Sequence, residues 1–276
     1  MRSVKRHGFT CPLHPLQTSS WVLVAYSMAV CFVVILPLLP DFLKSGFAVG
    51  FGITSVSLFL SALLTTTLDP TDPMATKPNP DRDEHAEYQA FCSICNCRVN
   101  LTAKHCGQCN RCVENFDHHC KWLNNCIGRR NYGLFVWTLV SMEAFSSLAI
   151  VFASITLTHI TLDTDDFSER LDSVYSIDHL DTLIGLLAFL LAINGFIFVG
   201  NGYLVCFHVW LRCHGLTTYE YISMQKKKVR PERVEVEIMR QATGPESTLR
   251  KTGEEQRILS TRGNTIDTVT RTDRMP

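Results

Sequence analysis

The sequence predicts an all-α membrane protein with four transmembrane helices and a cysteine-rich domain between the second and third helices. Apolar residues make up 46% of the 276 residues and charged residues only 19%, which is more apolar than a typical soluble protein. Four long apolar runs divide the chain, and eight of its twelve cysteines lie between Cys92 and Cys126. These three observations carry the prediction.

The first two membrane spans are predicted at residues 20–40 and 46–68, after an N-terminal tail at 1–19. Both runs are nearly free of charge over about 20 residues, which as a helix crosses ~30 Å of hydrocarbon. The first run is too long for the apolar part of a cleavable signal sequence. Buried helices of a soluble bundle are the alternative, but such helices carry a polar face that these runs lack.

The third and fourth spans are predicted at residues 132–160 and 181–211. Glu143 stands within the third run, where a carboxylate facing lipid would be costly. We therefore expect it to face the helix bundle, with Asn194 or Asn201 of the fourth run as a partner. A structural contact is a better expectation for Glu143 than catalysis.

The remaining segments are expected outside the membrane. Residues 69–131 form a linker rich in proline and charge, followed by the cysteine-rich domain with its core at 92–126. A segment at 212–240 follows the last span. Residues 233–239 alternate apolar and charged side chains, as a short strand does. Residues 241–276 are poor in large apolar residues and are expected to be disordered.

The distribution of lysine and arginine predicts the orientation. Three basic residues precede the first span, eight lie within 69–131 and thirteen follow from Arg212 onward, whereas the loop at 161–180 has Arg170 alone. Basic residues favour the cytosolic side. Both termini and the cysteine-rich domain are therefore expected in the cytosol of an endomembrane (ER or Golgi) or plasma-membrane protein. Since 26 basic residues balance 26 acidic ones, nucleic-acid binding is not expected.

The spacing of cysteines and histidines predicts bound zinc. Within residues 92–126, cysteines recur with two residues between them, and histidines lie among them. Tetrahedral zinc takes four such sulfur or nitrogen ligands. The core offers eight cysteines and three histidines, whereas two zinc sites need eight ligands. Three groups are therefore left over, and Cys97 falls outside the spacing pattern. Metal would also stabilise a segment with few large apolar residues, by about 10 kcal/mol or more.

The whole string from Cys92 through Cys126, with Asn131 and Phe135 after it, resembles the cysteine-rich domain of the DHHC family of protein S-acyltransferases, or palmitoyltransferases. The order of spans also resembles that family, so the likeness covers roughly residues 20–220. The family commonly has Asp-Pro-Gly where this chain has Asp69-Pro70-Thr71, and often proline where this chain has Lys121.

The resemblance implies roles for individual residues. One zinc ion would be held by Cys92, Cys95, His105 and Cys112, and a second by Cys106, Cys109, His119 and Cys126. The resemblance assigns the remaining Asp117, His118 and Cys120 to catalysis. It also implies that Thr218, in the Thr-Thr-Tyr-Glu sequence at residues 217–220, contacts Asp117.

These residue types suit nucleophilic catalysis. The thiolate is the reactive form of cysteine, and His118 can take the proton of Cys120 while Asp117 orients the imidazole. The alternative is that His118 and Cys120 are additional zinc ligands. Thr217 and Glu220 also fit the start of a helix, which needs no catalytic role.

The resemblance further implies the substrates. Cys120 would accept the acyl chain of a long-chain acyl-CoA such as palmitoyl-CoA and pass it to cytosolic cysteines of membrane-associated proteins. Trp122 is expected at the mouth of an acyl site between the spans. Arg129 and Arg130 are candidates for the anionic CoA head, although both can equally lie beside lipid headgroups.

Two other functions are weighed against this one. A zinc-binding membrane adaptor or scaffold with little transferase activity would keep the fold but has no need of Asp117, His118 and Cys120. A RING-like ubiquitin ligase would need a terminal pair of cysteines two residues apart, whereas the next cysteine after Cys126 is Cys206.

Overall fold

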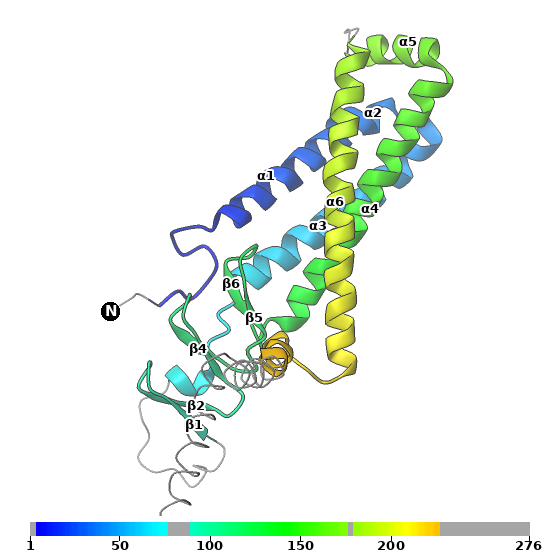
Figure 1. The fold of residues 1–276 in the computed structure, drawn as a ribbon. Coiled ribbons are helices and arrows are strands. Elements are labelled where there is room, and N and C mark those ends of the chain that lie inside the picture. The colour runs from blue at the N-terminus through cyan, green and yellow to red at the C-terminus, as the bar shows by residue number, and fades with distance from the viewer. Residues whose placement is uncertain (1–3, 77–88, 176–178, 227–276) are drawn as a thin grey trace, which may run out of the picture. The chain divides into compact units, whose positions relative to one another are not determined.

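The computed structural model describes residues 4–76, 89–175 and 179–226 (Figure 1). The chain divides into two compact units, residues 1–220 and 221–276. In the second unit, residues 221–226 are helical. The strand expected at 233–239 and the tail at 241–276 lie outside the described residues.

The first membrane span changes helix type near its end. It consists of α1 (Pro15–Ala29), the π-helical segment η1 (Val30–Ile35) and α2 (Leu36–Leu38). Pro37 has no backbone N–H, so the Val33 carbonyl lacks the donor that a regular helix would supply. The Tyr175 hydroxyl donates to this carbonyl instead. The chain thus keeps its helical course past a proline.

Three longer helices complete the set of spans: α3 (Asp41–Thr67), α4 (Tyr132–Leu162) and α6 (Leu180–Cys213). With the first, of 24 residues, these helices of 27, 31 and 34 residues are long and apolar enough to cross a bilayer. Within the residues that the structure describes, the predicted fold class with four candidate spans is therefore confirmed. The first two helices begin at Pro15 and Asp41, earlier than predicted, because polar residues at the membrane boundary continue the helical backbone.

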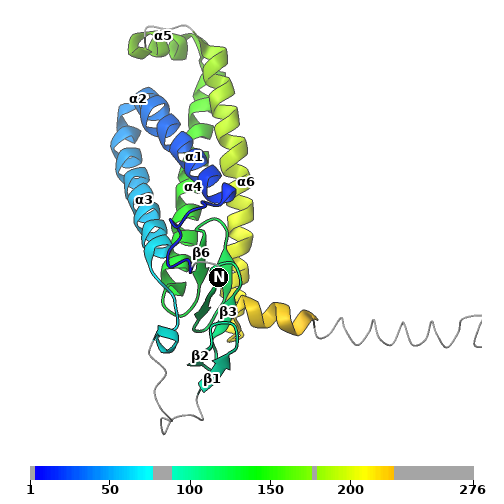
Figure 2. The same ribbon diagram turned by 90° about the vertical axis from the view of Figure 1, so that its left-hand side faces the viewer.

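A short helix, α5 (Thr164–Tyr175), lies in the segment expected to be a loop between the last two spans. Asp165 and Asp166 occupy its first turn, where acidic side chains favour a helix N-terminus. Phe167 and Leu171, four residues apart, are buried in the same apolar core as the spans. Figure 2 shows α5 at the end of α4 and α6 that is far from the strands.

Polar pairs join the spans within the bundle. Asn201 on α6 donates to the Glu143 carboxylate on α4 over 2.6 Å. Asn194 on α6 donates instead to the Ser27 hydroxyl on α1 over 3.0 Å. Of the two partners expected for Glu143, the structure therefore selects Asn201. Such contacts satisfy polar groups that lipid cannot.

The cysteine-rich region contains three antiparallel hairpins whose strands are too short to be predicted from periodicity. They pair β1 (Gln89–Cys92) with β2 (Cys97–Asn100), β3 (Lys104–Cys106) with β4 (Arg111–Val113), and β5 (His118–Cys120) with β6 (Asn125–Ile127), and a 3-10 turn, η2 (Pro73–Thr76), precedes them. Directly before the second strand of each hairpin stands an asparagine, Asn96, Asn110 or Asn124, with φ of 51°, 52° or 50°. Asparagine tolerates this left-handed conformation better than most residues.

A buried asparagine ties this region to the end of α3. Asn125 Nδ2 lies 2.9, 3.2 and 3.0 Å from the carbonyl oxygens of Thr65, Thr66 and Leu68. Carbonyls at a helix C-terminus lack donors within the helix, so this side chain acts as a cap. Arg111 donates to the Asn125 Oδ1 and so links the second hairpin to the same point.

The N-terminal segment packs against this junction. Gly8 N donates to the Thr66 carbonyl over 2.7 Å, and the Gly8 carbonyl accepts from Asn124 Nδ2 over 3.0 Å. A Cβ at position 8 would lie only 2.1 Å from the Leu123 carbonyl oxygen. Glycine is therefore required by the close approach of two backbones.

Candidate active site and metal centres

Strand β5 directs three consecutive side chains to two faces. Successive side chains of a strand alternate in direction, so His119 points to one face while His118 and Cys120 point to the other. The donor groups follow this alternation: His119 lies with three cysteines, whereas His118 lies with Asp117 and His208. One strand thus separates His119, a candidate metal ligand, from its two neighbours.

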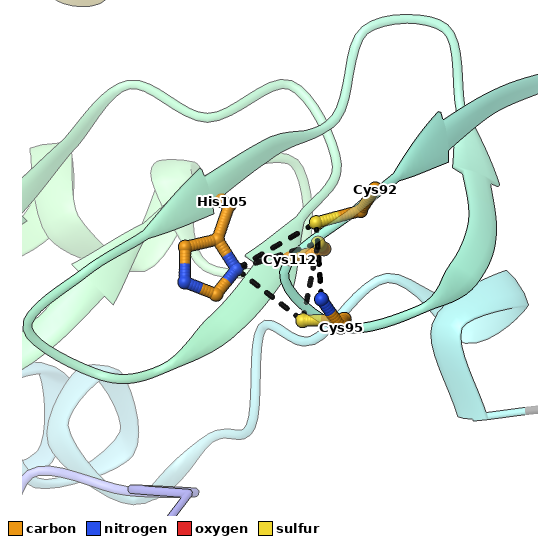
Figure 3. Close-up of side chains that lie close together, drawn as sticks. All are labelled: Cys92, Cys95, His105 and Cys112. Carbon is orange, nitrogen blue, oxygen red and sulfur yellow. Dashed lines mark hydrogen bonds between the residues drawn. The ribbon is translucent and has the colours of Figure 1, made fainter. Parts of the chain in front are cut away.

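The first donor group consists of Cys92, Cys95, His105 and Cys112 (Figure 3). His105 Nδ1 lies 3.8, 3.3 and 3.9 Å from the sulfurs of Cys92, Cys95 and Cys112. The sulfurs of Cys95 and Cys112 are 3.8 Å apart. Figure 3 shows these atoms converging on one point from the first two hairpins.

The second group consists of Cys106, Cys109, His119 and Cys126. His119 Nδ1 lies 3.9, 3.3 and 3.8 Å from the sulfurs of Cys106, Cys109 and Cys126. The register partner of His119 is Cys126, so the β5–β6 pairing itself brings two of the four donors together.

Strand β3 interleaves the two groups. His105 and its register partner Cys112 belong to the first group, whereas the adjacent Cys106 belongs to the second. Because neighbouring side chains on a strand point in opposite directions, β3 contributes to both. The two groups therefore come from overlapping stretches of sequence, residues 92–112 and 106–126.

Both groups fit tetrahedral zinc. Zn–S bonds of about 2.3 Å place the ligands of a regular tetrahedron about 3.8 Å apart, and Cys₃His is a known structural zinc set. The distances in the first group, from 3.3 to 3.9 Å, match this size. Cys97 lies in neither group, opposite Cys92 in the β1–β2 register.

Asp117, which is buried, forms a hydrogen-bonded pair with His118, which is partly buried. Asp117 Oδ2 lies 2.7 Å from His118 Nδ1, and Asp117 Oδ1 accepts from the Thr218 backbone N–H over 3.0 Å. Burial opposes ionisation of Asp117, but the hydrogen bonds from His118 and Thr218 outweigh it and lower the pKa of the carboxyl. Burial also disfavours imidazolium at His118, yet hydrogen bonds to Asp117 and Cys120 raise its pKa to about 9.

The Thr-Thr-Tyr-Glu sequence forms a capping box at the start of the helix that begins at residue 218. Thr217 Oγ1 accepts from the Glu220 N–H over 3.2 Å, and Glu220 Oε2 accepts from the Thr217 N–H over 2.9 Å. The next N–H, that of Thr218, is left free for Asp117. The contact with Asp117 expected of Thr218 is thus made by its backbone, at a helix N-terminus that favours a carboxylate.

Cys120 is buried in an apolar setting between the hairpins and the spans. It packs with Phe135 and Leu139 of α4 and with Leu204 and Val205 of α6. The ring of His118, which interacts with the thiol, lies edge-on to Phe135 with a centroid distance of 5.0 Å. The thiol therefore has a polar neighbour on one side and the ends of two membrane helices on the other.

His208 and Tyr132 also line this site, although no sequence motif predicted a role for them. The Tyr132 hydroxyl lies 3.1 Å from His208 Nδ1, and His208 is 3% exposed. Donor atoms of His208, His118 and Asp117 lie within 4.8 Å of one another. A histidine inside an apolar run is costly and therefore a candidate functional residue, which is the signal that could have identified His208.

The three residues expected near acyl-CoA lie at the surface. Trp122 is 50% exposed in the turn after Cys120. Arg129 pairs with Glu114, and Arg130 donates to the Asp69 carbonyl over 2.9 Å. Both arginines thus have partners within the chain, although their exposed side chains can still meet an anion.

Comparison with known proteins gives consistent matches. A family model described as DHHC palmitoyltransferase matches residues 85–225. Human "Palmitoyltransferase ZDHHC11" is 32% identical over 80% of this chain, and human "Probable palmitoyltransferase ZDHHC11B" is 33% identical over 80%. "Probable protein S-acyltransferase 20" of Arabidopsis thaliana is 34% identical over 53% of this chain and 21% of its own length. The matched regions cover 60% and 67% of the two human proteins.

Proposed function

The chain belongs to the DHHC palmitoyltransferase family, and from this premise we propose that it is a protein S-palmitoyltransferase. It moves a long-chain acyl group from acyl-CoA, through a thioester on Cys120, to cysteines of membrane-associated proteins. The observation that carries the proposal is the alternation along β5. His119 joins three cysteines, while His118 and Cys120 face Asp117 and the ends of α4 and α6.

The first half-reaction forms the acyl-enzyme. His118, whose pKa is raised to about 9, takes and holds the proton of the Cys120 thiol as an imidazolium, and the thiolate attacks the thioester carbonyl of acyl-CoA. The bond between the carbonyl carbon and the CoA sulfur breaks, and the CoA thiolate takes the proton back from His118. Asp117, 2.7 Å from His118 Nδ1, stabilises the imidazolium and fixes the ring so that Nε2 serves Cys120.

The second half-reaction transfers the chain. The thiol of a protein cysteine gives its proton to His118 and attacks the acyl-Cys120 carbonyl. Cys120 leaves as a thiolate and is reprotonated by His118, so the enzyme returns to its starting state. Both half-reactions need the same residues in the same protonation states, which supports one site for both substrates.

The apolar side of the site supports a long acyl chain. Phe135 and Leu139 of α4 form an apolar cluster with Cys120, and Leu204 and Val205 of α6 pack against this cluster. An acyl chain bound to the thiol would enter these apolar surroundings, and each buried methylene contributes about 0.8 kcal/mol. Trp122 would lie at the entrance, and Arg129 and Arg130 would meet the CoA phosphates on the polar side.

The two donor groups are proposed to hold structural zinc. Cys92, Cys95, His105 and Cys112 would bind one ion, and Cys106, Cys109, His119 and Cys126 would bind the other. Bound zinc would supply folding free energy and fix the hairpins that present His118 and Cys120. Zinc is proposed to have this structural role and no part in the acyl transfer.

The proposed orientation places the cysteine-rich region and both termini in the cytosol. Basic residues flank the ends of the spans near the hairpins, whereas Asp165 and Asp166 lie on α5 at the opposite ends. Cytosolic acyl-CoA can then reach Cys120 from water while its chain enters the bilayer. We place the protein in an endomembrane, ER or Golgi, or in the plasma membrane.

Intact mass spectrometry of the detergent-purified protein, incubated with acyl-CoAs of increasing length, tests the proposal. We expect one acyl adduct on the wild type that hydroxylamine removes, and none on Cys120→Ala. Cys97→Ser is the matched control because Cys97 belongs to the same domain and to neither donor group. An adduct that persists in Cys120→Ala, or a wild type that never acquires one, would refute the acyl-Cys120 mechanism and favour the adaptor.

A further inference from the structure

His208 on α6 is a buried titratable side chain that the two half-reactions leave unused. It belongs to the fourth span but lies beside the hairpin residues of the active site, with its nearest nitrogen within 4.8 Å of donor atoms of Asp117 and His118. Its ring centroid is 5.9 Å from that of His118. A span that only filled space could place an apolar residue here at lower cost.

The ring of His208 is held from two sides. Its Nδ1 lies 3.1 Å from the Tyr132 hydroxyl at the start of α4. Its ring packs against Phe135 in a T-shaped arrangement with a centroid distance of 5.1 Å. A side chain with a hydrogen bond and an aromatic contact has little freedom to rotate. His208 therefore offers a fixed surface to its neighbours.

His118 is in turn confined by this surface. Asp117 holds its Nδ1 edge, and Phe135 and His208 lie against the rest of the ring. The hydrogen bond at Nδ1 to Asp117 would by itself leave the imidazole free to tilt about that bond. The contacts from α4 and α6 restrict this tilt and so set the direction in which Nε2 points.

We propose that His208, held by Tyr132, is a positioning residue that orients the His118 imidazole toward Cys120. The inference rests on the proposed function and deepens it, because it assigns to the third and fourth spans a part in proton transfer as well as in lipid anchoring. The same helix also leads to Thr218, whose N–H binds Asp117. Helix α6 and the segment after it therefore contact both members of the Asp117–His118 pair.

The proposal predicts a change in turnover without a change in acyl-CoA binding. His208→Met and His208→Gln give side chains of similar length and volume, of which only glutamine can hydrogen-bond. We expect His208→Met to lower the rate of acyl-enzyme formation about 10-fold with an unchanged KM for palmitoyl-CoA, and His208→Gln to stay within about 3-fold of wild type. Tyr132→Phe should fall between them.

Asn194→Ala is the matched control. Asn194 is another buried polar residue of α6, but its partner is Ser27 on α1. This variant should lose stability without losing acylation rate. Zinc content of two ions per chain in every variant, measured by mass spectrometry, shows that the hairpins are intact.

A second measurement separates this proposal from the proposed function. Iodoacetamide alkylates the Cys120 thiolate without acyl-CoA, so its rate reports on the base that removes the proton. His208→Met should slow alkylation about 10-fold and His208→Gln should not. If methionine and glutamine behave alike in both assays, His208 acts by packing alone and the proposal is wrong. If wild type forms no acyl adduct but alkylation still depends on His208, the acyl-transfer function fails while the positioning role stands.

Discussion

Strands β3 and β5 place similar residues in similar positions with different results. On β3, His105 and Cys106 point to opposite faces, and each completes a group of four donors. On β5, His119 completes such a group, whereas His118 and Cys120 on the other face meet side chains of α4 and α6. The elements packed against the second face of a strand therefore decide whether a donor there joins a metal group or is left for chemistry.

Replacing the metal-facing histidine of either strand should have the largest effect. His105→Ala and His119→Ala each leave one group with three ligands, and structural zinc contributes about 10 kcal/mol or more to folding. We expect one zinc ion fewer per chain in each variant by metal analysis, together with rapid proteolysis of the cysteine-rich region. Retention of two zinc ions in both variants would show that the groups were assigned wrongly.

Replacing His118, the neighbour of His119, should lower the rate of catalysis without changing the zinc content. His118→Ala removes the base but no donor of either group, so zinc content should equal that of wild type. The rate of acyl-enzyme formation should fall by about 10² to 10⁴, the usual contribution of a general base. A time course by intact mass spectrometry measures it. A loss of zinc in His118→Ala would instead place this residue among the ligands.

The β3–β4 and β5–β6 hairpins are joined by the residues that pair with their cysteines. Arg111 is the register partner of Cys106, Asn125 is the register partner of Cys120, and the two side chains form a hydrogen bond. Asn125→Ala should lower the free energy of unfolding by about 1–3 kcal/mol, because it leaves buried carbonyls at the end of α3 without a donor. Thermal unfolding in detergent measures this. Combining it with Arg111→Lys should give a non-additive loss, and additive losses would contradict the coupling.

The smallest effect is expected at the capping box. Glu220→Ala removes the reciprocal hydrogen bond with Thr217 and should cost about 1 kcal/mol of helix stability. Because the Thr218 N–H then binds Asp117 less firmly, we expect acylation to slow by less than about 10-fold. Thr217→Ser keeps the capping hydroxyl and serves as the control. Equal losses in the two variants would mean that capping is not what orients Thr218.

The membrane helices could be predicted because lipid imposes a simple requirement. A span must be apolar for about 20 residues, and that pattern is visible without knowledge of the fold. The helix starts at Pro15 and Asp41 were missed because residues at the membrane boundary need not be apolar. Helix α5 was missed because its apolar stripe consists mainly of Phe167 and Leu171 among charged residues.

The candidate site was only partly predictable. Cysteine spacing and the family resemblance gathered the same two sets of four donors that the structure brings together. The hairpins escaped prediction because three-residue strands show no periodicity. His208 escaped because its partners, Tyr132 and His118, are distant in sequence, and only the packing of α6 against α4 and β5 brings them together.

The cap that Asn125 places on α3 links the end of a membrane helix to the proposed nucleophile. Asn125 is bound to the last turn of α3 and is the register partner of Cys120. A mismatch between helix length and bilayer thickness changes helix tilt. Because Asn125 joins α3 to Cys120, we expect a tilt of α3 to move the proposed nucleophile, so that thin and thick membranes hold its sulfur at different depths below the headgroups.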